Sequence, residues 1–166
     1  MKLLVVRHGP AGDPEAWKAE GRDDRLRPLT PDGKKAMRQA AAGLGRLIRR
    51  VDVIISSPLV RATQTAEIVA EEYDCEVIVR DTLLPDKDPE EVLASLQERR
   101  DDQIVAIVGH EPHLSTFITY VLSGTRSSFV DLKKGGACLL ELETASAGKA
   151  TLKWLLTRRE LARLNE

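Results

Sequence analysis

Apolar residues along the chain form short runs rich in β-branched side chains, separated by longer stretches with helical spacing. Runs typical of buried strands cover 2–6, 51–55 and 104–108, and a shorter strand is expected at 76–79. Helical spacing is clearest after Thr30, an N-cap residue followed by Pro31, with the apolar residues Met37, Ala40, Ala41, Leu44, Leu47 and Ile48. This alternation of strands and helices predicts an α/β domain with a sheet that is parallel at its centre.

The remaining elements complete a three-layer α/β/α sandwich. A helix is expected to follow the second strand, with Ser57 as N-cap and Pro58 at its first position. Further helices are expected at about 89–99, at about 112–122 before Gly124, and at 158–164. The segments 137–143 and 150–156 alternate apolar and polar residues and predict a hairpin at the sheet edge. Residues 7–29 are expected to be a polar loop.

Composition limits the classes of partner. The 166 residues are enough for one domain, here taken as 1–166, and the formal net charge of −1 gives no general attraction to nucleic acid or acidic membranes. The N-terminal apolar run is too short for a signal peptide, and no run has transmembrane length, so we expect a cytoplasmic protein. Cys75 and Cys138 lie far apart without a CxxC pattern and are expected to be reduced packing residues.

Basic side chains follow three of the predicted strands. Arg7, His8 and Gly9 follow the first strand, Arg61 lies about one turn inside the helix after the second, and His110 follows Gly109 at the end of the 104–108 strand. The carboxyl ends of parallel strands meet at one edge of a sheet, where ligands bind in α/β folds. We therefore expect Arg7, His8, Arg61 and His110 to converge, although each taken alone is also compatible with a strand-end histidine or a solvated arginine.

This set of residues suits phosphoryl chemistry. Arginine donates paired hydrogen bonds to phosphate oxygens and keeps its charge near neutral pH. A neutral imidazole can attack phosphorus and divide one displacement into two easier ones. Because the positive charges around the phosphoryl oxygens come from the chain itself, neither a metal nor another cofactor is expected.

These motifs resemble the histidine phosphatase superfamily, also called the phosphoglycerate-mutase-like superfamily. The resemblance covers about 110 residues and rests on Arg7-His8-Gly9, on 56–66 (SSPLVRATQTA) and on Gly109-His110, while 27–33 (RPLTPDG) and 109–112 (GHEP) are similar to SixA-type phosphohistidine phosphatases. It implies a phosphoglycerate-mutase-like fold. It also implies that His8 is the nucleophile and that Arg7, Arg61 and His110 hold the phosphoryl group. Gly9, Ser57 and Arg27 are further candidates for substrate binding.

The proton donor is left open by the sequence. Larger relatives use a carboxylate from an inserted segment, and the candidates here are Asp86, Asp88 and Glu111, each of which is also compatible with an ordinary loop or helix-start charge. A phosphate ester needs a donor to its leaving oxygen, whereas phosphohistidine releases an imidazole, a much better leaving group. We therefore expect a histidine-phosphorylated protein, such as a phosphotransfer domain or phosphocarrier, as substrate. The alternative is a small phosphomonoester.

Other classes are less consistent with the pattern. A catalytically silent phosphoprotein-binding module would not need all four pocket residues, and a receiver-like domain would carry aspartate at a strand end. A zinc hydrolase is disfavoured because His110 and His113 are three apart with Pro112 between them. We expect His113 to be a surface residue at the helix start or a residue that supports the site. Lys133 and Lys134 are expected to be turn charges or to contact substrate.

Overall fold

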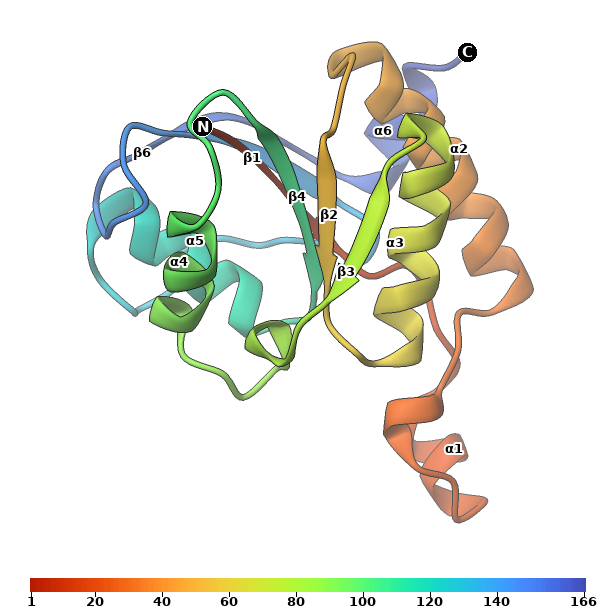
Figure 1. The fold of residues 1–166 in the computed structure, drawn as a ribbon. Helices are drawn as coiled ribbons and strands as arrows, with labels where there is room; N and C mark the ends of the chain where they lie inside the picture. The colour runs from red at the N-terminus through yellow and green to blue at the C-terminus, as the bar shows by residue number, and fades with distance from the viewer.

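The computed structural model describes residues 1–166, which form six strands and six α-helices around one sheet (Figure 1). The strand order across the sheet is β3-β2-β4-β1-β5-β6. The strands are β1 (Lys2–Arg7), β2 (Val53–Ser56), β3 (Glu76–Val79), β4 (Ile104–Gly109), β5 (Ala137–Leu142) and β6 (Ala150–Leu156). The expected strands and the expected edge hairpin are thus confirmed.

The centre of the sheet is parallel. Strand β4 pairs in parallel with both β1 and β2, and β2 pairs in parallel with β3, whereas β5 and β6 are antiparallel. Arg7 is the register partner of Gly109, and Ser56 is the partner of Val108. The carboxyl ends of β1, β2 and β4 therefore lie together at one edge, as expected for strands joined by helical crossovers.

Helices cover both faces of the sheet. Helices α2 (Pro31–Leu47), α3 (Val60–Tyr73) and α6 (Arg158–Arg163) lie on one face, and α4 (Pro89–Gln97) and α5 (His113–Ser123) lie on the other (Figure 1). Alternate residues of β1 point to opposite faces, so Leu4 and Val6 join the core cluster under α2, α3 and α6, whereas Leu3 and Val5 join the core cluster under α4 and α5. Each cluster contains 19 buried residues, which makes the domain the expected three-layer sandwich.

Local signals set two of the helix ends. Thr30 Oγ1 accepts a hydrogen bond from the Gly33 amide at 2.9 Å, which caps α2 as its sequence predicts. Gly124 ends α5 in the left-handed conformation, with φ of 79°.

Two predicted features of the chain were wrong. The segment 7–29 is not a plain loop, because it contains the short helix α1 (Pro14–Ala19) and a 3-10 turn, η1 (Asp24–Leu26); α1 buries no residue and so gives no apolar pattern. In Figure 1 α1 stands apart from the sheet and its helical layers. Ser57 is not the N-cap of α3, since that helix begins at Val60 and its N-cap position is held by Leu59. A second 3-10 turn, η2 (Asp81–Leu83), follows β3.

Candidate active site

The two histidines at the sheet edge face each other. Their ring centroids lie 5.2 Å apart, with the ring planes inclined at 50°. The backbone places them there directly, because the His8 amide donates to the Gly109 carbonyl at 3.0 Å and continues the pairing of β1 with β4. His8 is 6% exposed and His110 is 2% exposed. The expected convergence of these two side chains is therefore present in the fold.

The orientation of His8 leaves one ring nitrogen free for chemistry. Nδ1 lies 2.7 Å from the Gly9 carbonyl oxygen, which can only accept a hydrogen bond, so Nδ1 carries the proton in the neutral ring. Nε2 then keeps its lone pair. The Gly9 amide donates to Thr65 Oγ1 at 3.0 Å, and this hydroxyl donates to the Arg61 carbonyl at 2.8 Å. Helix α3 thus fixes the backbone that holds the imidazole.

Gly9 has a packing role in this arrangement. Its backbone is not among the positive-φ glycines, and a Cβ at this position would lie 2.4 Å from Met37 Cγ on α2. The turn after β1 therefore depends on close approach to α2 and not on left-handed backbone. A contact between Gly9 and substrate stays a prediction.

Both imidazoles are neutral near pH 7. Burial, together with the positive charges of Arg61, Arg7 and Lys134, lowers the pKa of His8 to about 4, against the opposing effect of the hydrogen bond with the Gly9 carbonyl. Burial and the neighbouring His8 lower the pKa of His110 to about 2. A neutral His8 is the form that a nucleophile requires.

Ser57 contacts His110 instead of capping a helix. Its Oγ lies 2.7 Å from His110 Nε2, and both side chains are buried. This contact joins the end of β2 to the residue after β4, so it orients the His110 ring across two strands. The sequence indicates Ser57 as a helix cap and as a substrate-binding candidate, and its contact with His110 carries no signal along the chain because the two residues lie 53 positions apart. A contact between Ser57 and substrate stays a prediction.

Arg61 lies beside the histidines and is held by Asp24. Its Nη1 donates to the Asp24 carbonyl at 3.0 Å, and its Nη2 lies 3.2 Å from Asp24 Oδ2. Asp24 Oδ1 accepts a 2.8 Å hydrogen bond from Arg27 Nε, so one carboxylate pairs with two nearly buried guanidinium groups. These hydrogen bonds hold the pKa of Asp24 below its usual range. Sequence reasoning missed Asp24, because η1 carries no apolar pattern and several charges stand close together there.

Arg7 and Arg27 occupy different surroundings. Arg7 Nη1 donates to the Leu132 carbonyl at 2.9 Å. Burial lowers the pKa of Arg7, against the opposing charges of Glu111 and Asp131, and no carboxylate forms an ion pair with it. Arg27 is occupied by Asp24 and by the Gly12 carbonyl, to which Nη1 donates at 2.7 Å. Arg27 therefore supports Arg61 through Asp24, and a substrate contact by Arg27 stays a prediction.

The three carboxylates considered as proton donors differ clearly in surroundings. Asp88 caps α4 and pairs with Arg126 at 2.6 Å, which lowers its pKa and keeps it ionised. Asp86 is exposed. Glu111 is half-buried, accepts hydrogen bonds from the amide and hydroxyl of Ser115, and has its pKa raised by burial. Of the three, Glu111 is the carboxyl whose surroundings favour the protonated form.

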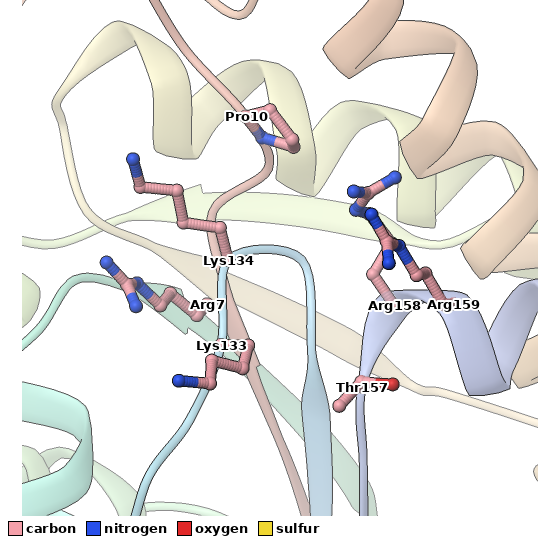
Figure 2. Close-up of a pocket in the computed structure, with 7 residues that line it drawn as sticks. All are labelled: Arg7, Pro10, Lys133, Lys134, Thr157, Arg158 and Arg159. Carbon is pink, nitrogen blue, oxygen red and sulfur yellow. The ribbon is translucent and has the colours of Figure 1, made fainter.

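The remaining predicted residues are placed as follows. His113 is 2% exposed, so the expectation that it lies on the surface was wrong; it begins α5 with its ring in the core. Lys133 and Lys134 line a cavity of about 650 Å³ with Arg7 (Figure 2).

No three His, Cys, Asp or Glu side chains are grouped so as to hold a metal ion. None of the helices combines the length and apolar character needed to cross a bilayer.

Comparison with known proteins identifies the family. Residues 3–84 match the profile of the histidine phosphatase superfamily (branch 1). The chain is 34% identical to an uncharacterized protein of Picosynechococcus sp. over 139 residues, which are 82% of each chain. It is 39% identical over 88 residues to phosphoserine phosphatase 1 of Hydrogenobacter thermophilus, a match that covers 51% of this chain and 38% of that protein. The chain belongs to the histidine phosphatase superfamily.

Solved structures give the same result for the fold. The protein histidine phosphatase SixA complexed with tungstate aligns with a TM-score of 0.80 and 25% identity, over 97% of this chain and 99% of that one. A structure from Nakamurella multipartitia, assigned as a phosphohistidine phosphatase SixA, aligns with a TM-score of 0.74 and 25% identity, over 93% of this chain and 94% of that one. A structure from Escherichia coli, assigned as an alpha-ribazole-5'-P phosphatase, aligns with a TM-score of 0.74 and 18% identity, over 95% of this chain and 97% of that one. At this identity the similarity concerns the fold alone. The fold is thus the phosphoglycerate-mutase-like one.

Proposed function

We propose that the protein is a phosphatase that removes a phosphoryl group from a histidine-phosphorylated protein through a covalent intermediate on His8. The observation that carries this proposal is the state of His8: a neutral, buried imidazole whose Nδ1 is held by Gly9 and whose Nε2 is free, beside His110, Arg7 and Arg61. Positive charge preorganised around a nucleophile stabilises the charge on transferring phosphoryl oxygens.

The reaction has two displacements. In the first, the lone pair of His8 Nε2 forms a bond to phosphorus while the bond from phosphorus to the leaving atom breaks and its electron pair departs with the leaving group. In the second, water attacks phosphorus, the P–Nε2 bond breaks, inorganic phosphate leaves, and the water proton passes to solvent. Arg7, Arg61 and His110 hold the phosphoryl oxygens in both steps. The chain supplies these groups itself.

A phosphohistidine substrate is supported by two features. The leaving imidazole needs less help from a proton donor than an alkoxide does, and two of the three carboxylates considered are exposed, Asp88 being an ionised helix cap. Two similar structures at 25% identity are named SixA: one is a protein histidine phosphatase, and the other is assigned as a phosphohistidine phosphatase.

A small phosphomonoester is the second candidate substrate. The observation in its favour is Glu111, a half-buried carboxyl near Arg7. Burial raises the pKa of Glu111, although the charge of Arg7 opposes this shift. A relative of this chain, phosphoserine phosphatase 1 of Hydrogenobacter thermophilus, is named for an ester substrate. In this case Glu111 protonates the leaving oxygen.

One comparison of rates tests both candidates. The protein, its His8→Ala variant and its Glu111→Gln variant are incubated with a histidine-phosphorylated protein and with nitrophenyl phosphate, in the presence of a chelator. We expect wild-type turnover to be faster on the P–N substrate and to be lost in His8→Ala. Faster ester turnover that falls in Glu111→Gln by more than P–N turnover would favour the second candidate, and full activity of His8→Ala would exclude both.

A further inference from the structure

A basic cavity lies directly beside the candidate phosphoryl pocket. It has a volume of about 650 Å³ and is lined by Arg7, Pro10, Lys133, Lys134, Thr157, Arg158 and Arg159. Arg7 is its one residue in common with the set His8, Arg7, Arg61 and His110, so the cavity adjoins that set without coinciding with it. Figure 2 shows Arg7, Lys133 and Lys134 on one side and Arg158 and Arg159, from the start of α6, on the other.

The positive charge of this cavity is mostly unpaired. Five of its seven lining residues are basic and none is acidic, in a chain with a formal net charge of −1. Lys133 forms an exposed ion pair with Asp131 at 2.8 Å, whereas Arg7, Lys134, Arg158 and Arg159 form none. The Nε atoms of Arg7 and Arg158 are buried without a hydrogen-bond partner. Like charges around one cavity repel each other, and a bound anion relieves that repulsion.

The loop that carries the lysines is built against the strand of the nucleophile. The Gly135 amide donates to the carbonyls of Arg7 and His8, at 3.1 and 3.0 Å, and the Arg7 amide donates to the Gly136 carbonyl. Gly135 has φ of 72°, and a Cβ there would lie 2.7 Å from Arg158 Cδ. The loop, β1 and α6 therefore meet at Gly135, which holds the cations of all three segments around one space.

We propose that this cavity is a second anion subsite, which binds a carboxylate or phosphate group carried by the same substrate that presents its phosphoryl group to His8. This inference rests on the proposed function and adds to it the class of substrate: one with a further anionic group next to the transferred phosphoryl group. That group is either an acidic side chain beside a phosphohistidine or a second anionic group on a small molecule. Arg7 contacts both sites and sets their spacing.

Two matched substrate pairs separate these sources. The first pair consists of phosphohistidine peptides that differ only in having Asp and Glu, or Asn and Gln, beside the phosphohistidine. The second pair is phenyl phosphate and carboxyphenyl phosphate. The variants are Arg158→Gln/Arg159→Gln and, on a different segment, Lys134→Gln. The control is Arg163→Gln, an exposed arginine on α6 that does not line the cavity.

We expect the wild type to prefer the more anionic member of at least one pair, through a lower KM. The preference, expressed as a ratio of kcat/KM values, should fall about three- to tenfold in the double variant, as expected for two partly exposed ion pairs. Lys134→Gln should lower the same ratio, Arg163→Gln should not, and high salt should reduce it. Preference within the peptide pair identifies a protein source, and preference within the phenyl pair identifies a small-molecule source.

Two results would overturn the subsite. One is equal kcat/KM for both members of both pairs in the wild type, and the other is an equal loss of preference in Arg163→Gln and in the double variant. Either result leaves the proposed function in place as long as turnover requires His8. Turnover that persists in His8→Ala instead removes the proposed function, whatever the preference.

Discussion

Arg61 of α3 and Asp24 of η1 are joined by two contacts, one to the Asp24 carbonyl and one to its carboxylate. The same carboxylate pairs with Arg27, so it separates two guanidinium groups that would otherwise repel each other. An anion bound at Arg61 offers the same kind of partner as Asp24. The contact therefore orients Arg61 before a phosphoryl group arrives.

Asp24→Asn should destabilise the free protein and increase its response to phosphate. We expect a loss of about 1–2 kcal/mol, below the usual cost of breaking a buried pair because the Asp24 side chain is half exposed. Added phosphate or tungstate should raise Tm more in this variant than in the wild type, since the anion replaces the lost charge. Thermal unfolding measures both effects. Asp23→Asn is the control, and equal Tm values for the two variants would contradict this role.

Ser57→Ala should impair the site by leaving His110 Nε2 without its partner. We expect kcat to fall about tenfold, which corresponds to about 1.4 kcal/mol of barrier. The adjacent Ser56→Ala is a matched control, because Ser56 is equally buried but its hydroxyl donates to the neighbouring Ser57 carbonyl. Steady-state rates on one substrate test this, and equal kcat values for the two variants would show that Ser57 does not position His110.

The two buried imidazoles predict how stability depends on pH. Their pKa values, about 4 for His8 and about 2 for His110, lie below the value of about 6.5 for histidine in the unfolded chain. Below pH 6.5 the unfolded state therefore binds more protons than the folded state, and stability falls as the pH falls. We expect each imidazole to lower the free energy of unfolding by about 1–2 kcal/mol between pH 7 and pH 5.

Urea denaturation at pH 7, 6 and 5 measures this loss, and His8→Ala should show a smaller one. Proton NMR of the three histidine rings is an independent check, with His8→Ala assigning one ring. A ring of His8 that titrates near pH 6.5 would contradict the inferred neutral nucleophile.

Gly135→Ala should cost more stability than Gly148→Ala. Both glycines have positive φ, at 72° and 69°, so both variants bear the backbone strain of about 1–2 kcal/mol. Only at Gly135 does a Cβ meet side chains closely, at 2.7 Å from Arg158 and 2.8 Å from Met37, whereas the nearest atom at Gly148 is 3.5 Å away. We expect a further loss of about 1 kcal/mol at Gly135 from these contacts. Denaturant unfolding of both variants measures the loss in the free energy of unfolding, and equal losses would contradict the closer packing around Gly135.

The sequence predicts the parts of this structure that depend on periodic burial. The apolar runs ending at Val6, Ile55 and Val108 are strands, and parallel pairing brings His8 and His110 together as expected. Contacts that depend on exposed or irregular backbone were not predictable in this way. Helix α1 buries nothing, and Ser57 precedes a helix as a cap would, although its hydroxyl contacts His110.

Partners that come together only in three dimensions were also missed. Asp24 reaches Arg61 because η1 folds back onto α3, and Arg158 lines the cavity beside Arg7 because Gly135 permits close packing with the loop before β5. Neither contact leaves a periodic signal in the chain, since each joins one exposed or partly exposed charge to a distant segment.

Trapping of the phosphoenzyme tests the central claim most directly. The protein is mixed with a labelled phosphohistidine protein in the presence of a chelator, quenched within the first turnover, and digested for mapping of the label. We predict an acid-labile, base-stable phosphoryl group on His8 that appears before free phosphate and is absent in His8→Ala. Release of phosphate with no label on His8, or with label on another residue, would contradict it.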